Sequence, residues 1–453
     1  MKKKLQKYEE KEKLDSDNHQ QQLTAMKEKL SEYKEQRNRE REMFEAKIYD
    51  VLNKVFTPGQ IRSLLNPSKK RVIWSPEDIA SAMSLRSVSP KAYRYLRNVI
   101  KTPLPALSTL RRWASNISTE PGIINAVLHC MKVKGKSMEN FEKLVVVTFD
   151  EVYLSNKVGI DRKIQKVIGP HKTCQCVMVR SLFANWKQPI YYDYDKAMKK
   201  DTLETIISQL YHVGYTVVAI ACDMGSSNMA LWSELNIEVP PKNCHFPHPV
   251  DHSLQVFAFA DVPHLLKLAR NHLLDNGFTV CGQRIDKKCL QRIVDINTKD
   301  IKVSYSLTQY HLDVQGTERQ KVLPAVQVFS ERVAKAIEWY GLKGYMDKLD
   351  WTESARVIKL FNNWFDIFNA SSMYGQHEGK NAYGINVERQ NCILDEMNTL
   401  MNEIKIGNHK SLIAFQKGIM VNNSSLRKML PYIQEKYSNS KFKIMYILTR
   451  RLD

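Results

Sequence analysis

The sequence predicts an α+β protein with several domains, because three stretches of the 453-residue chain differ in composition and hydrophobic period. Residues 1–55 are dense in charge and carry apolar residues at helical spacing. Residues 140–262 contain short β-branched runs that are typical of buried strands. Residues 263–432 return to helical spacing. A chain of this length accommodates about two to four domains.

The chain is strongly basic. Lys and Arg number 68 against 48 Asp and Glu, and the net charge of +20 favours a polyanionic partner, nucleic acid first and an anionic membrane surface second. No run of about eighteen apolar residues is present, so we expect no membrane span. The eight cysteines form no CxxC pair and the N-terminus has no apolar h-region, which indicates reduced thiols in the cytosol or nucleus and no signal peptide.

Residues 1–55 are expected to form one amphipathic helix that dimerises as a coiled coil. Its apolar residues recur mostly at steps of three and four: Leu23, Met26, Leu30, Tyr33, Phe44, Ile48, Val51 and Val55. Arg37 and Glu40 interrupt this seam. The alternative is a single helix that packs on its own chain, since an apolar stripe does not identify its partner.

Residues 56–118 are expected to form a helix-turn-helix DNA-binding domain of short helices. Three helices have a clear start signal, an N-cap residue followed by Pro: Thr57-Pro58, Ser75-Pro76 and Ser89-Pro90. A further helix opens with Ser108 and Thr109 and carries Arg111 and Arg112, which suits a helix that reads DNA.

The helix expected after Ser89 has a basic face. Its cations recur at steps of three and four: Lys91, Arg94, Arg97 and Lys101. We expect these residues and the Ser108–Arg112 segment to contact DNA, because the surrounding positive charge favours phosphates. The alternative is a small helical adaptor with a solvated basic face.

Two aspartates end buried strand-like runs. Asp150 follows residues 144–149, and Asp223 follows residues 216–222. A carboxylate at the end of a buried strand is costly unless it binds something. Two such groups on one sheet supply the hard oxygen ligands that a divalent metal requires. The alternative is that each aspartate only caps the next helix or turn.

The elements around these aspartates predict a ribonuclease H-like fold. After the first strand we expect strands at 174–182 and 189–193, a helix at 201–213 and the strand that ends before Asp223. Strand–strand–strand–helix–strand, with acids after the first and fourth strands, is the order of that fold. In it the two acids end neighbouring strands and share a metal.

A helical block is expected to interrupt this α/β domain. A strand at 251–259 precedes it and a strand at 443–448 follows it, which is why an insertion fits better than an appended module. Its helices are expected at residues 264–274, 288–297, 321–340, 354–368 and 385–404.

Motifs that occur in a fixed order run from about residue 55 to residue 452. They are FTPGQIR (56–62), LPALSTLRRW (104–113), FDE (149–151), WKQP (186–189), DMGSSN (223–228), DVPHLLK (261–267), RNH (270–272), NWFDIFN (363–369), FQKGI (415–419), VNN (421–423) and YILT (446–449). Together they resemble the P-element family of DNA transposases, including its THAP-associated relatives. The resemblance implies a dimerisation helix, a helix-turn-helix, a ribonuclease H-like catalytic domain and a GTP-binding insertion. The expected domains follow this order: residues 1–55, 56–118, 119–262, 263–432 and 433–453.

The resemblance implies cut-and-paste transposition through an acidic DDE triad. Asp150 and Asp223 match its first two acids, and two Mg²⁺ (or Mn²⁺) ions would activate water or a DNA 3′-hydroxyl. The family's third acid is a Glu a few residues past the YILT motif, and this chain stops at Asp453, before that position. No Cys/His constellation of the family's THAP zinc module precedes residue 55. Enzyme activity therefore stays open, and the alternative is a truncated or domesticated DNA-binding repressor without catalysis.

The resemblance also implies GTP as an assembly cofactor. No P-loop is present, but the segment 297–300 resembles the NKxD element that reads guanine. A family lysine after it is replaced by Ser306. Phe365 is expected to stack on the base and Asp366 to pair with its edge; the alternative is an ordinary helix with a core Phe. The expected nucleotide contacts are Asn297, Asp300, Val322, Ser330, Phe365, Asp366 and Asn369.

These expectations combine into a nuclear protein that binds double-stranded transposon-end DNA as a dimer or tetramer. After the transposase and the repressor, a third candidate function is a guanine-nucleotide switch that does not act on DNA. A zinc site at Cys244, His248 and His252 is a weaker alternative, because Pro247 and Pro249 preclude a regular helix there.

Overall fold

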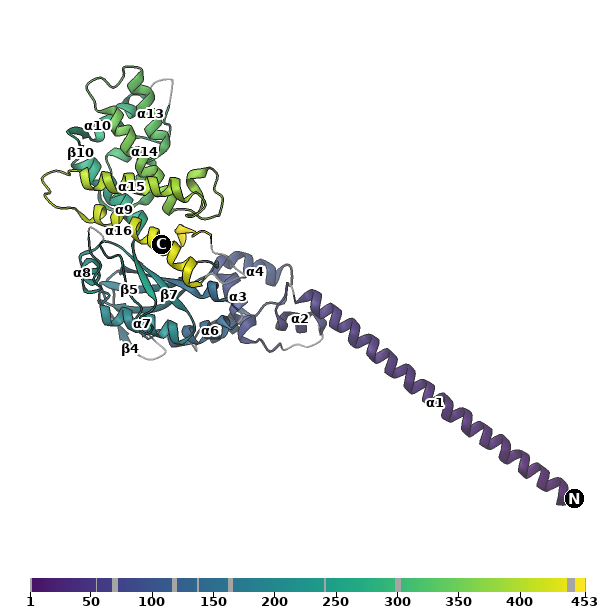
Figure 1. The fold of residues 1–453 in the computed structure, drawn as a ribbon. Helices are drawn as coiled ribbons and strands as arrows, with labels where there is room; N and C mark the ends of the chain where they lie inside the picture. Colours follow the sequence, from purple (N-terminus) through teal and green to yellow (C-terminus); the bar gives the residue numbers. More distant parts are fainter. Residues whose placement is uncertain are drawn as a thin grey trace. The chain divides into compact units, whose positions relative to one another are not determined.

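The computed structural model describes residues 2–53, 55–66, 72–115, 120–136, 138–161, 166–239, 242–297, 303–437 and 445–452. The chain divides into two compact units, Met1–Ser118 and Thr119–Asp453 (Figure 1).

The first unit begins with one long helix, α1 (Lys2–Leu52), as expected from its composition. Ion pairs one turn apart stabilise its surface, including Arg41 with Glu45 at 2.9 Å. The apolar stripe is solvent-exposed where its side chains are described; Met26 is 75% and Tyr33 71% exposed. Such a stripe on an otherwise polar helix needs a partner, and the dimeric coiled coil stays a prediction.

Four short helices follow α1. They are α2 (Pro58–Leu65), α3 (Pro76–Val88), α4 (Pro90–Asn98) and α5 (Leu107–Ser115). The three Ser/Thr-Pro start signals are confirmed, because Thr57, Ser75 and Ser89 are the N-cap residues. The fourth helix begins at Leu107, so Ser108 lies inside α5 and does not open it. Their small core contains Ile79, Ala82, Tyr93, Leu104 and Leu110.

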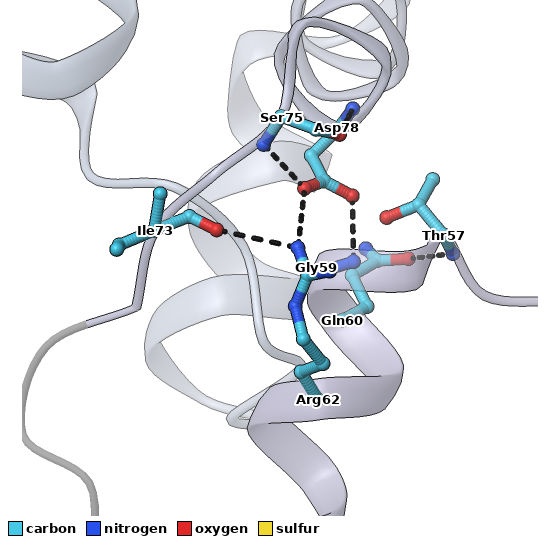
Figure 2. Close-up of polar contacts among 7 residues, drawn as sticks. All are labelled: Thr57, Gly59, Gln60, Arg62, Ile73, Ser75 and Asp78. Carbon is cyan, nitrogen blue, oxygen red and sulfur yellow. Dashed lines mark hydrogen bonds and ion pairs between the residues drawn. The ribbon is translucent and has the colours of Figure 1, made fainter.

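The carboxylate of Asp78 joins α2 to α3 (Figure 2). Its Oδ2 accepts the backbone N–H of Ser75 at 2.7 Å, and its Oδ1 accepts that of Gly59 at 2.9 Å. Burial by itself would raise the pKa of Asp78, but the hydrogen bonds outweigh it and the pKa lies below the ordinary value. A Cβ on Gly59 would lie 2.1 Å from Asp78 Oδ2, so this helix start requires glycine. One carboxylate thus caps two helices at once.

A seven-stranded mixed sheet forms the centre of the second unit, in the order β1-β6-β5-β2-β7-β9-β8. β2 is antiparallel to β5 and parallel to β7, and β7 is parallel to β9. The expected order of three strands, a helix and a fourth strand is confirmed, with α7 (Lys200–His212) as that helix. The strands are β1 (Gly122–Ile123), β2 (Leu144–Tyr153), β5 (Thr173–Ser181), β6 (Lys187–Tyr194), β7 (Thr216–Cys222), β8 (His245–Pro247) and β9 (Gln255–Ala260).

Helices cover this sheet and build the block that interrupts it. α10, α13 and α14 group beyond the sheet, and α9 and α16 join them to it (Figure 1). The other helices are α6 (Asn125–Gly135), α8 (Ser226–Glu234), α9 (Val262–Asp275), α10 (Lys287–Asn297), α11 (Gln309–Leu312), α12 (Val322–Val328), α13 (Glu331–Leu342), α14 (Trp351–Phe368), α15 (Val387–Glu403) and α16 (Ala414–Tyr437). The described residues also form two hairpins, β3 (Gly159–Asp161) with β4 (Lys166–Ile168) and β10 (Phe278–Val280) with β11 (Gln283–Ile285). Their short 3₁₀ turns are η1 (Asn140–Lys143), η2 (Gly316–Gln320), η3 (Glu378–Lys380) and η4 (Thr449–Arg451).

The structure corrects the helical block in two places. The single helix expected at 321–340 is α12 followed by α13, because the hydroxyl of Ser330 accepts the N–H of Val333 and starts a new helix. α16 was not delimited from the sequence, since Gly418 and Pro431 interrupt its pattern.

The return strand expected at 443–448 is not formed by its described part. Residues 443 and 444 lie outside the described residues. Ile447 makes a single isolated bridge with Tyr383, and no strand includes residues 445–448.

Candidate active site and nucleotide pocket

Asp150 lies within β2 and does not end it, which corrects the expectation from the sequence. β2 pairs with β7 only as far as Thr148 opposite Ala221, but with β5 as far as Tyr153. Asp150 therefore has a strand neighbour, Cys176, on one side and no pairing partner in β7 on the other. Its Oδ1 accepts the N–H of Glu151 at 2.8 Å, and the side chain is exposed.

Asp223 directly follows β7, as expected, and its carboxylate is held from one side. Its Oδ1 accepts the N–H of Gly225 at 3.0 Å and the side-chain amide of Asn228 at 2.6 Å. Its Oδ2 lies 3.8 Å from His264 Nδ1. These contacts orient the carboxylate, and the bond from Gly225 N–H caps the turn, which was its alternative role; α8 itself has no side-chain cap at Gly225.

The two aspartates line one cavity of about 250 Å³ at this edge of the sheet. Asp261, at the end of β9, lines it as well, and the sequence had placed this residue only in a motif. Its side chain accepts the N–H of His264 at 3.1 Å and caps α9. Burial raises the pKa of Asp261, and the charge of Asp150 adds to this effect. A carboxylate after a third buried strand was the signal that could have identified it.

Helix α16 supports this edge of the sheet from behind. The side-chain amide of Asn422 is fully buried and pairs with both backbone groups of Ala260, the residue before Asp261, at 2.7 and 2.9 Å. Ser425 donates to the carbonyl oxygen of Ala258 at 2.6 Å. The end of β9, beyond its pairing with β8, thus obtains from a helix the hydrogen bonds that a longer neighbouring strand would supply.

The carboxylates suit a hard cation in donor type. Oxygen ligands on rigid strands are what Mg²⁺ or Mn²⁺ prefers, and Asp150 and Asp223 both supply them. Within the described ranges, no three His, Cys, Asp or Glu side chains are grouped closely enough to hold a metal. The zinc alternative is accordingly not formed: His248 Nδ1 instead accepts the N–H of Val250 at 3.3 Å.

A larger cavity, of about 790 Å³, lies within the helical block. Its walls come from the segments before and along α13, from α14 and from the η3 turn: Val303, Ser306, Val326, Gln327, Ser330, Glu331, Arg332, Lys335, Ala336, Trp339, Asn362, Asp366, His377 and Lys380. Such a volume suits a nucleotide-sized ligand. Three of these residues carry a fixed positive charge, and Asp366 is the buried acid.

Asp366 is held in place by its neighbours. Asn362 Nδ2 donates to Asp366 Oδ2 at 3.2 Å, and His377 Nε2 lies 3.9 Å from the same oxygen. Burial raises the pKa of Asp366, although Lys380 and His377 oppose this. Among the cations, Arg332 lies over the ring of Tyr305, 4.5 Å from its centroid.

Of the expected nucleotide contacts, the structure brings Ser330 and Asp366 into this cavity. Asn297 is buried and donates to the carbonyl oxygen of Ser304 at 2.8 Å. Phe365 packs in the hydrophobic core. Val322 begins α12 and Asn369 ends α14, and neither lines the cavity. Asp300 lies outside the described residues.

The sequence did not identify the cavity's Arg332, Lys335, Asn362, His377 or Lys380. Arg332 and Lys335 are three residues apart on α13, and Asn362 and Asp366 are four apart on α14. These spacings show which side chains share a helix face, but not which two helices face each other.

The expected DNA-contacting residues lie on or next to α4 and α5. Lys91, Arg94 and Lys101 are exposed, and Lys101 follows α4 in a left-handed backbone conformation. Ser108, Arg111 and Arg112 are exposed on α5, whereas Thr109 is half-buried. Arg97 is half-buried, and its Nε donates to the carbonyl oxygen of Leu104 at 3.2 Å. That contact gives Arg97 a structural role in addition to its charge.

A mixed sheet with paired aspartates, followed by a helical block and preceded by short helices, is the architecture expected of a ribonuclease H-like DNA transposase. Three family models match the chain: "Transposable element P transposase-like, HTH domain" at 2–113, "TNP-like, RNase H N-terminal domain" at 119–236 and "TNP-like, GTP-binding insertion domain" at 263–381.

Known proteins agree with these matches. The chain is 37% identical over 408 residues to the Transposable element P transposase of Drosophila melanogaster, covering 90% of this chain and 53% of that protein. It is 24% identical to the human DNA transposase THAP9, over 67% of this chain and 36% of that protein. The solved Drosophila P element transposase strand transfer complex matches with a TM-score of 0.76 and 36% identity, over 90% of both chains. The chain belongs to the P-element transposase family, and it spans about half or less of the curated relatives' length.

No helix among the described residues is both long and apolar enough to cross a membrane.

Proposed function

We propose that this protein is a P-element-type transposase core. It binds transposon-end DNA in the nucleus as a dimer or tetramer, cleaves it and transfers the strand with Mg²⁺ or Mn²⁺, and uses GTP as an assembly cofactor. The observation that supports this best is the pair Asp150 and Asp223, which two neighbouring parallel strands carry into one cavity. The strand transfer complex of the matched relative is consistent with it.

The side chains at the cavity are arranged for binding a cation at the edge of the sheet. Asp150 and Asp223 would hold the metal, which would activate a hydroxyl nucleophile and stabilise the leaving oxygen. Asn228 and the N–H of Gly225 occupy Oδ1 of Asp223, so Oδ2, which lies 3.8 Å from His264 Nδ1, is the oxygen that would contact the cation. Glu151 N–H similarly occupies Oδ1 of Asp150. Each carboxylate is therefore oriented before any ligand arrives, which lowers the cost of binding.

The charges of the larger cavity support GTP as the ligand. A carboxylate such as Asp366 can accept the two N–H donors on a guanine edge. The cations of Arg332, Lys335 and Lys380 suit phosphate oxygens. Lys335 is also paired with Glu331 at 2.8 Å, so phosphates would have to compete with that acid. The Ser306 hydroxyl lines the same cavity and offers no charge.

The exposed cations on α4 and α5 support DNA binding. They belong to a chain with a net charge of +20, which favours a polyphosphate backbone. A long α1 with an exposed apolar stripe would join two copies, and two copies would hold two DNA ends. The second candidate function is a DNA-binding repressor, which would use the same cations and the same dimerisation helix. It differs in one respect: the carboxylate cavity would not cleave DNA.

Cleavage of a labelled transposon-end duplex, with Mg²⁺ or Mn²⁺, tests the proposal. We expect Asp223→Asn to abolish cleavage and to leave DNA affinity unchanged. Asp201→Asn is the matched control, because Asp201 is an exposed aspartate elsewhere in the same domain. Equal cleavage by Asp223→Asn and the parent protein would contradict the catalytic assignment.

A parent protein that binds end DNA with a steep salt dependence but does not cleave it would favour the repressor. Absence of DNA retention at moderate salt, with GTP binding intact, would favour the nucleotide switch instead.

A further inference from the structure

Two thiols lie side by side on the strand next to Asp150. Cys174 and Cys176 are two residues apart on β5, so both side chains point to the same face of the sheet. Their Sγ atoms are 3.7 Å apart. Residues two apart in a strand repeat at about 6.6–6.8 Å, so these side chains turn toward each other and do not stand parallel.

The spacing of the two sulfur atoms matches a chelated soft cation. A tetrahedral zinc ion with Zn–S bonds of about 2.3 Å separates two of its sulfur ligands by roughly 3.8 Å. A disulfide fits the strand poorly, because it requires an S–S bond of about 2.05 Å and Cβ atoms about 3.5–4.5 Å apart. The pair therefore suits a metal placed between the thiolates better than a bond that joins them.

The pair can be reached from the carboxylate cavity. Cys176 is exposed and lines that cavity together with Asp150, its register partner on β2. Directly opposed residues on one sheet face have Cβ atoms about 4.5–5.5 Å apart. Cys174 is half-buried behind it. A soft cation can bind both thiols only by displacing their protons.

We propose that Cys174 and Cys176 form a two-thiolate site for a soft divalent cation, Zn²⁺ or its analogue Cd²⁺, at the rim of the carboxylate cavity. Two thiolates hold the cation, and water completes its coordination. Soft sulfur ligands select such ions over Mg²⁺, which prefers oxygen. This site is separate from the proposed catalytic use of Asp150 and Asp223. Where that use also holds, a cation on Cys176 adds positive charge beside Asp150 and inhibits cleavage.

Cadmium titration of the full chain tests the site, with the thiolate-to-cadmium ultraviolet absorption as readout. The reference protein carries Cys130→Ser, Cys281→Ser and Cys392→Ser, which removes the exposed thiols outside the site. We expect one tightly bound Cd²⁺ per chain, and competition by Zn²⁺. In this background Cys176→Ser should weaken binding at least about 100-fold, more than the 10–100-fold typical of losing an outer-shell partner. Cys174→Ser should act alike.

Two further measurements separate this site from the catalytic one. Asp223→Asn should leave Cd²⁺ affinity unchanged, and millimolar Mg²⁺ should not compete. Cd²⁺ that still binds to both serine variants, or that is displaced by Mg²⁺, would overturn the proposal and place the ion on the carboxylates. Catalytic failure of the parent protein with intact Cd²⁺ binding would leave this site standing and refute only the proposed function.

Discussion

The carboxylate cavity and the nucleotide pocket lie in the same unit but depend on the sequence in different ways. Asp150 and Asp223 belong to two strands that are neighbours in the sheet and recognisable from their β-branched runs. The pocket's charged residues come from α13, α14 and the η3 turn, which approach one another only in the folded helical block. A site built on paired strands can therefore be predicted from the local sequence pattern. A site between helices can be identified only when the packing of those helices is known.

The two regions also hold their acids differently. Asp223 is oriented by hydrogen bonds from its own helix start, within five residues along the chain. Asp366 also accepts a hydrogen bond from its own helix, from Asn362 one turn earlier, but it is buried beside His377 of another segment, and this burial raises its pKa. If this contrast is correct, substitutions at the cavity should affect chemistry alone, and those at the pocket should affect nucleotide affinity and its pH dependence.

The largest effect is expected at Asp150. Asp150→Asn should lower cleavage at least about 1,000-fold, the size typical of losing a group that acts directly in the reaction. Glu151→Gln is the matched control, because the neighbouring residue of a strand points to the other face. Single-turnover cleavage of end DNA measures both. Similar losses of cleavage in Asp150→Asn and Glu151→Gln would show that the catalytic role is not confined to the face of β2 that carries Asp150.

Asp366→Ala should weaken GTP binding about 100-fold, since hydrogen bonds to a charged group contribute about 1.5–3 kcal/mol. Isothermal titration of GTP measures the affinity, and Asp347→Ala is the control at an exposed aspartate of the same block. DNA cleavage at saturating GTP should be unchanged. A variant with normal GTP affinity would show that the nucleotide, if bound, uses another site.

Arg332→Ala should weaken GTP about tenfold and guanosine much less, because one charge-assisted bond to phosphate is lost at a partly exposed site. Lys343→Ala, an exposed lysine at the end of the same helix, is the control. Titrations of GTP and of guanosine measure the two affinities, and their ratio shows whether Arg332 contacts the phosphates. An equal loss for guanosine would place Arg332 at the base and reverse the orientation of the ligand.

The smallest effect is a pH dependence of GTP affinity. The pKa of Asp366 is raised, and pairing with guanine needs its charged form, so affinity should fall as the pH is lowered toward that raised pKa. His377→Gln is the companion variant, because His377 Nε2 lies 3.9 Å from the Asp366 carboxylate. A pH dependence that persists in this variant assigns the effect to Asp366. Affinity that is independent of pH in the parent protein would argue against Asp366 as the base-reading group.

Much of the fold followed from the sequence where one local rule was sufficient. The Ser/Thr-Pro signals placed three helix starts, and the run before Asp223 matched β7 residue for residue. Errors occurred where competing contacts decided. Ser330 divided a helical stretch in two, and pairing with β5 extended β2 past Asp150.

The side-chain contacts that fix the fold and the site were predicted less completely than the elements themselves. Asp78 illustrates the limit: its capping box with Ser75 is visible in the sequence, but its second bond, to Gly59 across 19 residues, is not. Asn422, which holds the end of β9 from α16, gave no signal because a buried amide in a helix has no periodic pattern.

By itself the sequence determined the central strands of the sheet, three capped helix starts and the two aspartates, because hydrophobic period, capping and the cost of a buried charge act over a few residues. The tertiary structure alone decided that Asp261 joins these aspartates, that α13 and α14 enclose a cavity, and that the Cys174 and Cys176 thiols converge beside Asp150. The reason is physical: which helices pack together, and how side chains turn toward each other, depends on contacts between residues that are far apart in the chain.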